Sequence, residues 1–269
     1  MRFGVIGGDA RQAALAALLR EKGAAVVTYG VAGEDGDREK ALEADILLLP
    51  LPLAKEEGRL NCEKDPVALP QLFSRLRRSQ CILAGQVKEA DRRMAAEYGL
   101  TIQDYFLREE LTVANAAITA DCAIRLARER LDGSLPPTLV LGFGRIGKFL
   151  CHRLQHLGIH VTAAARKPED LAWARGYGYE TLHICTLFGH LGAFGLVFNT
   201  VPAMVLPESL AAELMPSALC IDLASSRGIE RRDSLWARGL PGKMAPKEAA
   251  RAILTAVEHI LSEERGETI

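Results

Sequence analysis

Short apolar runs alternate with stretches of helical periodicity along the first part of the chain. The runs at 45–52, 81–85 and 100–105 predict buried strands, and the spacing of apolar residues over 69–78 and 88–98 predicts helices between them. Strands that alternate regularly with helices are typical of a parallel sheet. The pattern therefore predicts an α/β domain of flavodoxin or Rossmann type.

The pattern in the middle of the chain is that of a nucleotide-binding unit. An apolar run leads into Gly142-x-Gly144-x-x-Gly147, and a helical pattern and a second strand that ends at Arg166 follow. In this context the glycines permit a tight turn, a close approach of the backbone to a pyrophosphate, and close packing of helix on strand. The turn residues expected to contact a dinucleotide are Gly142, Phe143, Gly144, Arg145, Ile146 and Gly147.

The end of the second strand indicates which dinucleotide is bound. NAD sites usually place Asp or Glu here to accept a hydrogen bond from the ribose 2′-hydroxyl. This chain has Arg166 and Lys167, and no carboxylate occurs before Glu169. Two cations suit a 2′-phosphate, although solvated loop cations are the alternative. The sequence therefore predicts NADP.

Two later apolar runs, at 196–202 and 219–226, predict further strands that end in polar residues. In a parallel nucleotide-binding sheet, such ends line the crevice near the nicotinamide. We expect Ser225 to take part in catalysis. The residues of the first run expected to contact the cofactor are Asn199, Thr200, Val201 and Pro202.

Residues 2–30 repeat the strand–turn–helix–strand layout, but Asp9 replaces the second glycine and Gln12 the third. A carboxylate at that position repels a pyrophosphate, so a smaller anion is expected there. Arg11 is predicted to clamp a substrate carboxylate, and Asp9 to orient it or to move a proton. The backbone N–H groups of Gly7 and Gly8 are further candidate donors. The alternative is that Asp9 only caps the helix and Arg11 is a surface cation.

Helical spacing continues over 108–132, which predicts a helix that connects two domains. We expect two Rossmann-like parallel-sheet domains joined by this long helix, with a cleft between them. Residues 1–110 with about 246–269 form the expected substrate domain, and 111–245 the NADP-binding domain. Asn115 and Thr119 share one face of the helix, and they are predicted to be catalytic. The alternative is an exposed polar stripe.

Composition narrows the function classes. The net charge of −1 offers no reason to expect nucleic acid or a membrane surface as a partner. No apolar run is long enough to span a membrane, and strand begins at the first residues, so no signal peptide is expected. Six single cysteines are typical of reduced thiols in a cytoplasmic protein. His152 and His156 lack a HExxH pattern, so no metal site is expected.

With these motifs together, the chain resembles the family of dipicolinate synthase A subunits from spore-forming bacteria. The resemblance implies a role in sporulation through NADP-dependent formation of dipicolinate, from dihydrodipicolinate or its 4-hydroxytetrahydro precursor. It also implies an oligomer with a flavoprotein-like B subunit. The loop at 226–232 departs from the family's Lys-Pro-Gly-Gly-like turn. The stretches that carry the resemblance are 5–12, 111–120, 139–147, 197–203, 221–225 and 240–247.

Two other functions remain open at this stage. Another two-domain NADP dehydrogenase, of the 2-hydroxyacid or shikimate type, is the first. Hydroxyacid enzymes use a catalytic histidine in the second domain, and none occurs between His190 and His259. A non-catalytic NADP-sensing subunit is the second. For a small dicarboxylate substrate, the candidate cations are Arg11, Arg227 and Lys243.

Overall fold

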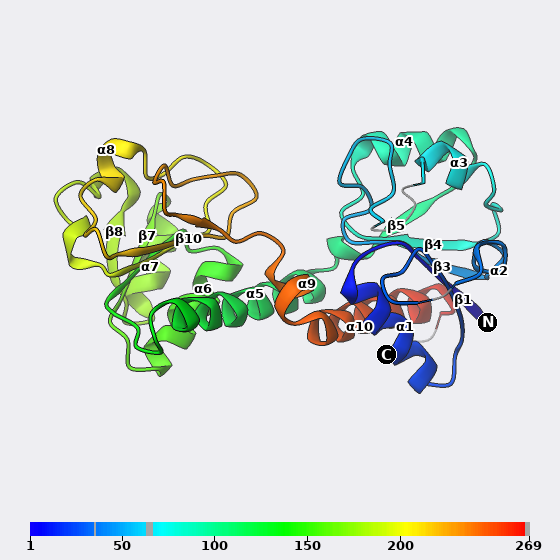
Figure 1. Cartoon of the computed structure of the whole chain (residues 1–269), viewed down its shortest axis with the longest axis horizontal. Helices are drawn as coiled ribbons and strands as arrows, with labels where there is room; N and C mark the ends of the chain where they lie inside the picture. The colour runs from blue at the N-terminus through cyan, green and yellow to red at the C-terminus, as the bar shows by residue number, and fades with distance from the viewer. Residues whose placement is uncertain (35, 63–66, 267–269) are drawn as a thin grey trace. The chain divides into compact units, whose positions relative to one another are not determined.

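The computed structural model describes residues 1–34, 36–62 and 67–266. The chain divides into two compact units, one formed by residues 1–115 and 242–269 and the other by residues 116–241. Each unit has its own parallel β-sheet with helices packed on it (Figure 1). The expected α/β fold with two parallel sheets is therefore confirmed.

The described residues of the first unit form a sheet of five parallel strands. These are β1 (Arg2–Ile6), β2 (Ala25–Tyr29), β3 (Ile46–Leu48), β4 (Cys81–Ala84) and β5 (Ile102–Asp104). Their order is β2-β1-β3-β4-β5, the order of flavodoxin-like doubly wound sheets. The order reverses between β1 and β3, and ligands bind at the carboxyl ends of strands at such a point.

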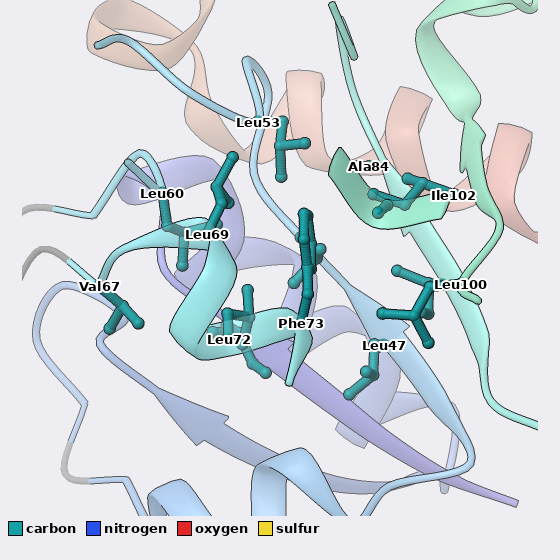
Figure 2. Packing of buried hydrophobic residues seen from close by; sticks show 14 of the residues in the cluster. Leu47, Leu53, Leu60, Val67, Leu69, Leu72, Phe73, Ala84, Leu100 and Ile102 are labelled. Atoms are coloured by element: carbon teal, nitrogen blue, oxygen red, sulfur yellow. The ribbon is translucent and has the colours of Figure 1, made fainter. Parts of the chain in front are cut away.

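Helices cover both faces of this sheet. The helices are α1 (Ala10–Glu21), α2 (Arg38–Leu42), α3 (Leu69–Phe73), α4 (Glu89–Glu97) and α10 (Pro246–Glu264), with a 3-10 turn η1 (Tyr105–Leu107) after β5. α1 and α10 pack against each other and share one core with the sheet, although they lie at opposite ends of the chain (Figure 1). The other core holds residues of α2, α3 and α4. Figure 2 shows Phe73 and Leu72 of α3 directed into this core with Leu47 of β3.

The helix expected up to residue 78 ends at Phe73. The side chain of Gln80 explains the early end. Its amide oxygen accepts the N–H of Arg77 at 2.7 Å, and its amide nitrogen donates to the carbonyl of Leu42 at 2.7 Å. Because this buried amide takes a backbone donor that a longer helix would use, a tertiary contact overrides the local helical pattern.

The second unit, whose residues are all described, contains a sheet of six parallel strands. These are β6 (Thr138–Leu141), β7 (Val161–Ala165), β8 (Glu180–His183), β9 (Leu196–Asn199), β10 (Leu219–Asp222) and β11 (Leu235–Trp236). Their order, β11-β10-β9-β6-β7-β8, is that of the dinucleotide-binding Rossmann fold. β8 and β11 are not marked by apolar runs, because β8 is only partly buried and β11 has two residues.

The helices of the second unit begin with the long α5 (Glu109–Arg130), which starts within the residues of the first unit. The others are α6 (Arg145–His156), α7 (Pro168–Gly176) and α8 (Glu208–Ala211), with 3-10 turns η2 (Ile184–Thr186) and η3 (Leu191–Ala193); α9 (Leu240–Met244) spans the boundary between the units. Leu139 and Val197, on neighbouring strands, share a core with residues of α8 and η3. Within the described part of the chain, no helix combines the length and apolarity that a membrane crossing requires.

Candidate functional site

The glycine motif lies at the point where the order of the second sheet reverses. β6 ends at Leu141, and its neighbours are β7 on one side and β9 on the other. Thr200, directly after β9, donates from its N–H and its hydroxyl to the carbonyl of Leu141, at 2.8 and 2.9 Å. The turn that follows β6 is therefore fixed against the end of β9, at the place where such sheets bind ligands.

Two glycines of the motif have no room for a side chain. Gly142 has a φ of +96°, and a Cβ on it would lie 2.3 Å from Oγ1 of Thr200. A Cβ on Gly147 would lie 2.1 Å from the carbonyl oxygen of Gly142. The first turn of α6 thus rests directly on the turn after β6.

Gly144 differs from these two, because a Cβ on it would meet no atom within 4 Å. It occupies the N-cap of α6 with a φ of −75°, and it has no side chain to cap the helix. The first N–H groups of a helix point outwards and attract anions. The space left by Gly144 and the uncapped helix start together fit a pyrophosphate.

The expected 2′-phosphate ligands lie at the end of β7. Arg166 follows the last strand residue, and Lys167 is the N-cap of α7; both are exposed. Among the described residues, neither side chain forms an ion pair. His183, at the end of β8, accepts the N–H of Cys185 at its Nδ1, so Nε2 carries the ring proton and donates to the carbonyl of Arg166 at 3.0 Å. This bond fixes the backbone that carries the two cations.

A buried carboxylate organises the opposite side of the crevice. Asp222 of β10 faces Asn199 of β9 in register, and Nδ2 of Asn199 donates to Oδ1 of Asp222 at 2.9 Å. Asp222 also accepts the N–H groups of Ala224 at 3.1 Å and Gly228 at 2.7 Å. Asn199 bonds the N–H and the carbonyl of Val201 as well. One pair of side chains therefore shapes the loops after both strands.

This network changes the role expected for Asn199. Its side chain is fully buried, so it positions the loop and presents no surface to a cofactor. The ring of Phe143 is also buried, and it contacts Tyr177 and Tyr179 with ring centroids 6.5 and 6.0 Å apart. The predicted residues that remain exposed or half-buried at the ends of β6, β9 and β10 are Gly144, Arg145, Ile146, Thr200, Val201, Pro202 and Ser225.

The reversal point of the first sheet holds an ion pair. Asp9 caps α1, and its carboxylate accepts Nε and Nη2 of Arg11 at 2.9 and 2.8 Å. Nη2 also donates to the carbonyl of Leu51, in the segment after β3. The side chain of Arg11 is 11% exposed, so it is not the surface cation of the alternative interpretation. Nε and Nη2 are thus used within the protein, whereas Nη1 forms no hydrogen bond with the residues that the structure describes.

The charge state of Asp9 follows from this pairing. Burial by itself raises the pKa of the Asp9 carboxyl, but hydrogen bonds from Arg11 and its positive charge outweigh burial and hold the pKa below its ordinary value. A Cβ on Gly242 would lie 3.0 Å from both Nε of Arg11 and Oδ2 of Asp9. Gly242 thus packs on the pair, with the exposed Lys243 next to it in sequence.

The backbone donors expected at Gly7 and Gly8 are not available to a ligand, so that expectation is wrong. The N–H of Gly7 donates to the carbonyl of Tyr29 at 2.8 Å, and the N–H of Gly8 donates to the carbonyl of Asn61 at 2.7 Å. Both glycines extend the pairing of the sheet beyond β1. The first glycine turn is therefore closed to a ligand at these two positions. The N–H of Gly142 in the second unit is used in the same way as that of Gly7, since it donates to the carbonyl of Ala164 at 2.7 Å.

The two polar residues of α5 lie on either side of the boundary between the units. Asn115 is half-buried at the end of the first segment, and Thr119 is buried in the second unit. Elsewhere, His152 and His156 contact each other on α6, with ring centroids 4.1 Å apart. Within the described residues, no group of three His, Cys, Asp or Glu side chains is arranged to hold a metal.

A family model and a known protein both relate this chain to the dipicolinate synthase A subunit. Residues 2–106 match the model of the N-terminal domain of the dipicolinate synthase A subunit. The dipicolinate synthase A subunit of Bacillus subtilis (strain 168) is 27% identical over 290 residues, with 99% of this chain and 98% of that protein covered. The chain is a homologue of the dipicolinate synthase A subunit.

Solved structures extend this homology to the fold. The crystal structure of the dipicolinate synthase A chain from Bacillus subtilis has a TM-score of 0.82 and 26% identity, and the match covers 100% of this chain and 98% of that one. A transhydrogenase from Sinorhizobium meliloti matches with a TM-score of 0.71 and 15% identity, covering 97% of this chain and 85% of that one. The second match shows that the fold also occurs in a transhydrogenase.

Two positioning residues of this homologue were not anticipated. Asp222 had a signal in the sequence, because it is a carboxylate at the end of the apolar run Leu219–Asp222. His183 had none, since it ends a strand that no apolar run marks. Both act on the backbone of loops at the carboxyl edge of the second sheet.

Proposed function

We propose that the protein is an NADP-dependent oxidoreductase that forms dipicolinate from dihydrodipicolinate or its 4-hydroxytetrahydro precursor. One observation carries this proposal: in a homologue of the dipicolinate synthase A subunit, Arg166 and Lys167 lie without ion-pair partners among the described residues where NAD sites place a carboxylate. Guanidinium and ammonium groups bind a 2′-phosphate through charge-assisted hydrogen bonds.

The residues at the end of β6 and β7 fit the cofactor. In this proposal the uncapped start of α6 and the open space at Gly144 bind the pyrophosphate, and Arg166 and Lys167 bind the 2′-phosphate. When bound, NADP⁺ would supply the acceptor for a hydride from the substrate ring, and the 4-hydroxytetrahydro precursor would first lose water to give the dihydro ring. Asn199 and Asp222 fix the loops beside the proposed nicotinamide position, so these loops lose little conformational entropy when the cofactor binds.

The ion pair of Asp9 and Arg11 is the proposed substrate site of the first unit. In this proposal Nη1 of Arg11 donates to a substrate carboxylate, because Nε and Nη2 already bond to Asp9. Asp9 remains ionised at neutral pH because its pKa is lowered, so it orients Arg11 and accepts a proton only from an acidic carbon. Formation of an aromatic ring supplies the driving force, so a weak base suffices. Asn115, Thr119 and Ser225 complete the proposed catalytic set.

We also propose that the protein works in an oligomer with a second, flavoprotein-like B subunit. Support comes from the relative's name, which makes it one subunit of a dipicolinate synthase. A location in the cytoplasm, where NADP is available, and a role in sporulation belong to the same proposal.

Product formation tests the proposed function directly. The purified protein is mixed with NADP⁺ and freshly made product of dihydrodipicolinate synthase, with and without the B subunit, and the ultraviolet absorbance of dipicolinate is followed. We expect dipicolinate and NADPH in equal amounts, and a slower reaction with NAD⁺. NADPH formation from 2-hydroxyacids or shikimate instead would identify a different dehydrogenase. Cofactor binding without turnover in either mixture would favour a non-catalytic role.

A further inference from the structure

Two arginines lie against one tryptophan at the edge of the second sheet. The guanidinium carbons of Arg227 and Arg238 are 5.7 and 5.0 Å from the ring centroid of Trp236. All three side chains are exposed, with 41% of Trp236 accessible. Neither arginine pairs with a carboxylate among the residues that the structure describes. Two positive charges thus lie against one aromatic ring, and no carboxylate of the described residues pairs with either of them.

The loop that carries Arg227 is fixed at several points. Its two ends are held by the carboxylate of Asp222, through the N–H groups of Ala224 and Gly228. Trp236 adds a third bond, because its Nε1 donates to the carbonyl of Ala224 at 3.0 Å. The same indole therefore holds both the loop and the cations. A charged group on a fixed backbone loses less entropy when it binds a ligand than one on a mobile loop.

The position of this loop favours the substrate over the cofactor phosphates. It follows β10, and β10 pairs with β9, whose terminal loop lies beside the glycine turn after β6. The 2′-phosphate ligands expected at Arg166 lie at the end of β7, on the other side of β6. In a Rossmann sheet of this order, the β9–β10 half is the nicotinamide half.

We propose that Arg227 and Arg238, positioned by Trp236, form a two-cation site that binds carboxylate oxygens of a small dicarboxylate substrate, in addition to the donor proposed at Arg11. The identity of that substrate as a pyridine dicarboxylate or its reduced precursor rests on the proposed function. Each guanidinium presents a planar fork that matches a carboxylate, so a site with two of them favours a dianion over a monoanion. Trp236 is a positioning residue in this site. Without a bound anion, the cation–π contacts would be an ordinary surface feature.

Fluorescence of Trp236 reports binding without any turnover. The chain has two tryptophans, so Trp173→Phe leaves Trp236 as the sole indole. This variant, saturated with NADPH, is titrated with pyridine-2,6-dicarboxylate and, separately, with pyridine-2-carboxylate. We expect a saturable change in emission with the dicarboxylate, and binding weaker by roughly tenfold or more with the monocarboxylate.

Arginine variants in the Trp173→Phe protein test whether Arg227 and Arg238 bind the dicarboxylate. Arg227→Ala and Arg238→Ala should each weaken binding of the dicarboxylate by roughly tenfold or more. Arg227→Lys and Arg238→Lys should recover only part of the lost affinity. Arg232→Ala is the matched control, because Arg232 is an exposed arginine of the same segment and, within the described residues, makes no cation–π contact with Trp236. NADPH affinity should stay within about twofold in all of them. Equal binding of mono- and dicarboxylate, or unchanged binding in both alanine variants, would overturn the inference.

Kinetics separate this inference from the proposed function. If dipicolinate forms and both alanine variants keep the parental KM, the two-cation site is wrong and the function stands. If the dicarboxylate binds through both arginines but no dipicolinate forms, the site stands and the function is wrong. A loss of NADPH affinity in the alanine variants would assign the arginines to the cofactor and overturn the inference.

Discussion

Asp222 and Asn199 lie opposite each other on neighbouring strands, and the amide of Asn199 donates to the carboxylate over 2.9 Å in the interior of the second unit. Both side chains are almost fully buried. Through their remaining hydrogen bonds they set the loops that follow β9 and β10. A buried polar pair of this kind specifies a geometry more than it adds stability, because its groups must all find partners once they leave water.

Asn199→Ala should therefore lower the free energy of unfolding and make the loops after β9 and β10 less ordered. The variant leaves a carboxylate oxygen of Asp222 and the N–H of Val201 without their amide partner, which costs about 1–3 kcal/mol. Denaturant unfolding of the full chain measures this change. Ser225→Ala, at an exposed position in the loop after β10, is the control and should shift stability by about 0.5 kcal/mol or less. Equal stabilities of the two variants would show that the network is dispensable.

Gly144→Ala and Gly147→Ala should separate cofactor binding from folding. Gly147→Ala forces a Cβ to 2.1 Å from the carbonyl of Gly142, so the helix must shift and stability falls by about 1–3 kcal/mol. Gly144→Ala meets no protein atom within 4 Å and has a permitted φ, so the melting temperature should not fall. The new methyl group occupies the space proposed for the pyrophosphate, so NADPH binding should still weaken.

Calorimetry with NADPH checks both glycine variants. A Gly144→Ala protein that binds NADPH as tightly as the parent would place the phosphates elsewhere. A Gly147→Ala protein with an unchanged melting temperature would mean that the contact between α6 and the turn relaxes without cost.

Arg166→Ala should weaken the affinity for NADPH roughly 10- to 100-fold, as expected for the loss of charge-assisted hydrogen bonds worth about 1.5–3 kcal/mol. NADH affinity should change little, since NADH carries no 2′-phosphate. Arg175→Ala is the matched control, because Arg175 lies at the far end of α7 and bonds to Thr181. His183→Ala should reduce the preference for NADPH by a smaller factor, because it releases the carbonyl of Arg166. Equal affinity of the unmodified protein for both cofactors would contradict the assignment.

Asp9→Asn should change how stability depends on pH. Asparagine keeps a cap oxygen for α1 but removes the charge that pairs with Arg11. The folded-state pKa of Asp9 is lowered, so the contribution of its charge is fully present above the unfolded pKa of about 3.9 and is lost as pH falls through the lower folded pKa. The difference in unfolding free energy between parent and variant should be largest at neutral pH and shrink below about pH 4. A constant difference across this range would contradict the pairing.

Local patterns were enough to predict the turn after β6, because the glycines act on their own neighbours. Gly147 is required by its contact with the nearby carbonyl of Gly142, and Gly142 takes a positive φ in the same turn, although its contact with Thr200, directly after β9, comes from a neighbour in the sheet and not in the sequence. The burial of the Arg11 side chain, in contrast, depends on residues that are far from it in the sequence. Its burial follows from the carbonyl of Leu51 and from the packing of Gly242, which no pattern around position 11 reveals.

The closed turn at Gly7 and Gly8 illustrates the same limit. Its sequence allows an open anion site, and only the position of Asn61 and Tyr29 shows that the N–H groups are already used. The cation–π contacts of Trp236 likewise join residues from two loops around a two-residue strand. Such features arise from how strands line up, so they become visible only with the fold.

The place of α10 in the first unit has a consequence for synthesis of the protein. Ile253 and Val257 of this last helix share a core with Leu15 of α1, while the second unit is a continuous stretch of chain between them. On the ribosome, the second unit emerges complete before the first unit has the helix that covers one face of its sheet. The first unit therefore keeps an apolar surface exposed until α10 has been synthesised, and a nascent chain arrested before residue 246 is expected to carry one folded and one unfinished domain.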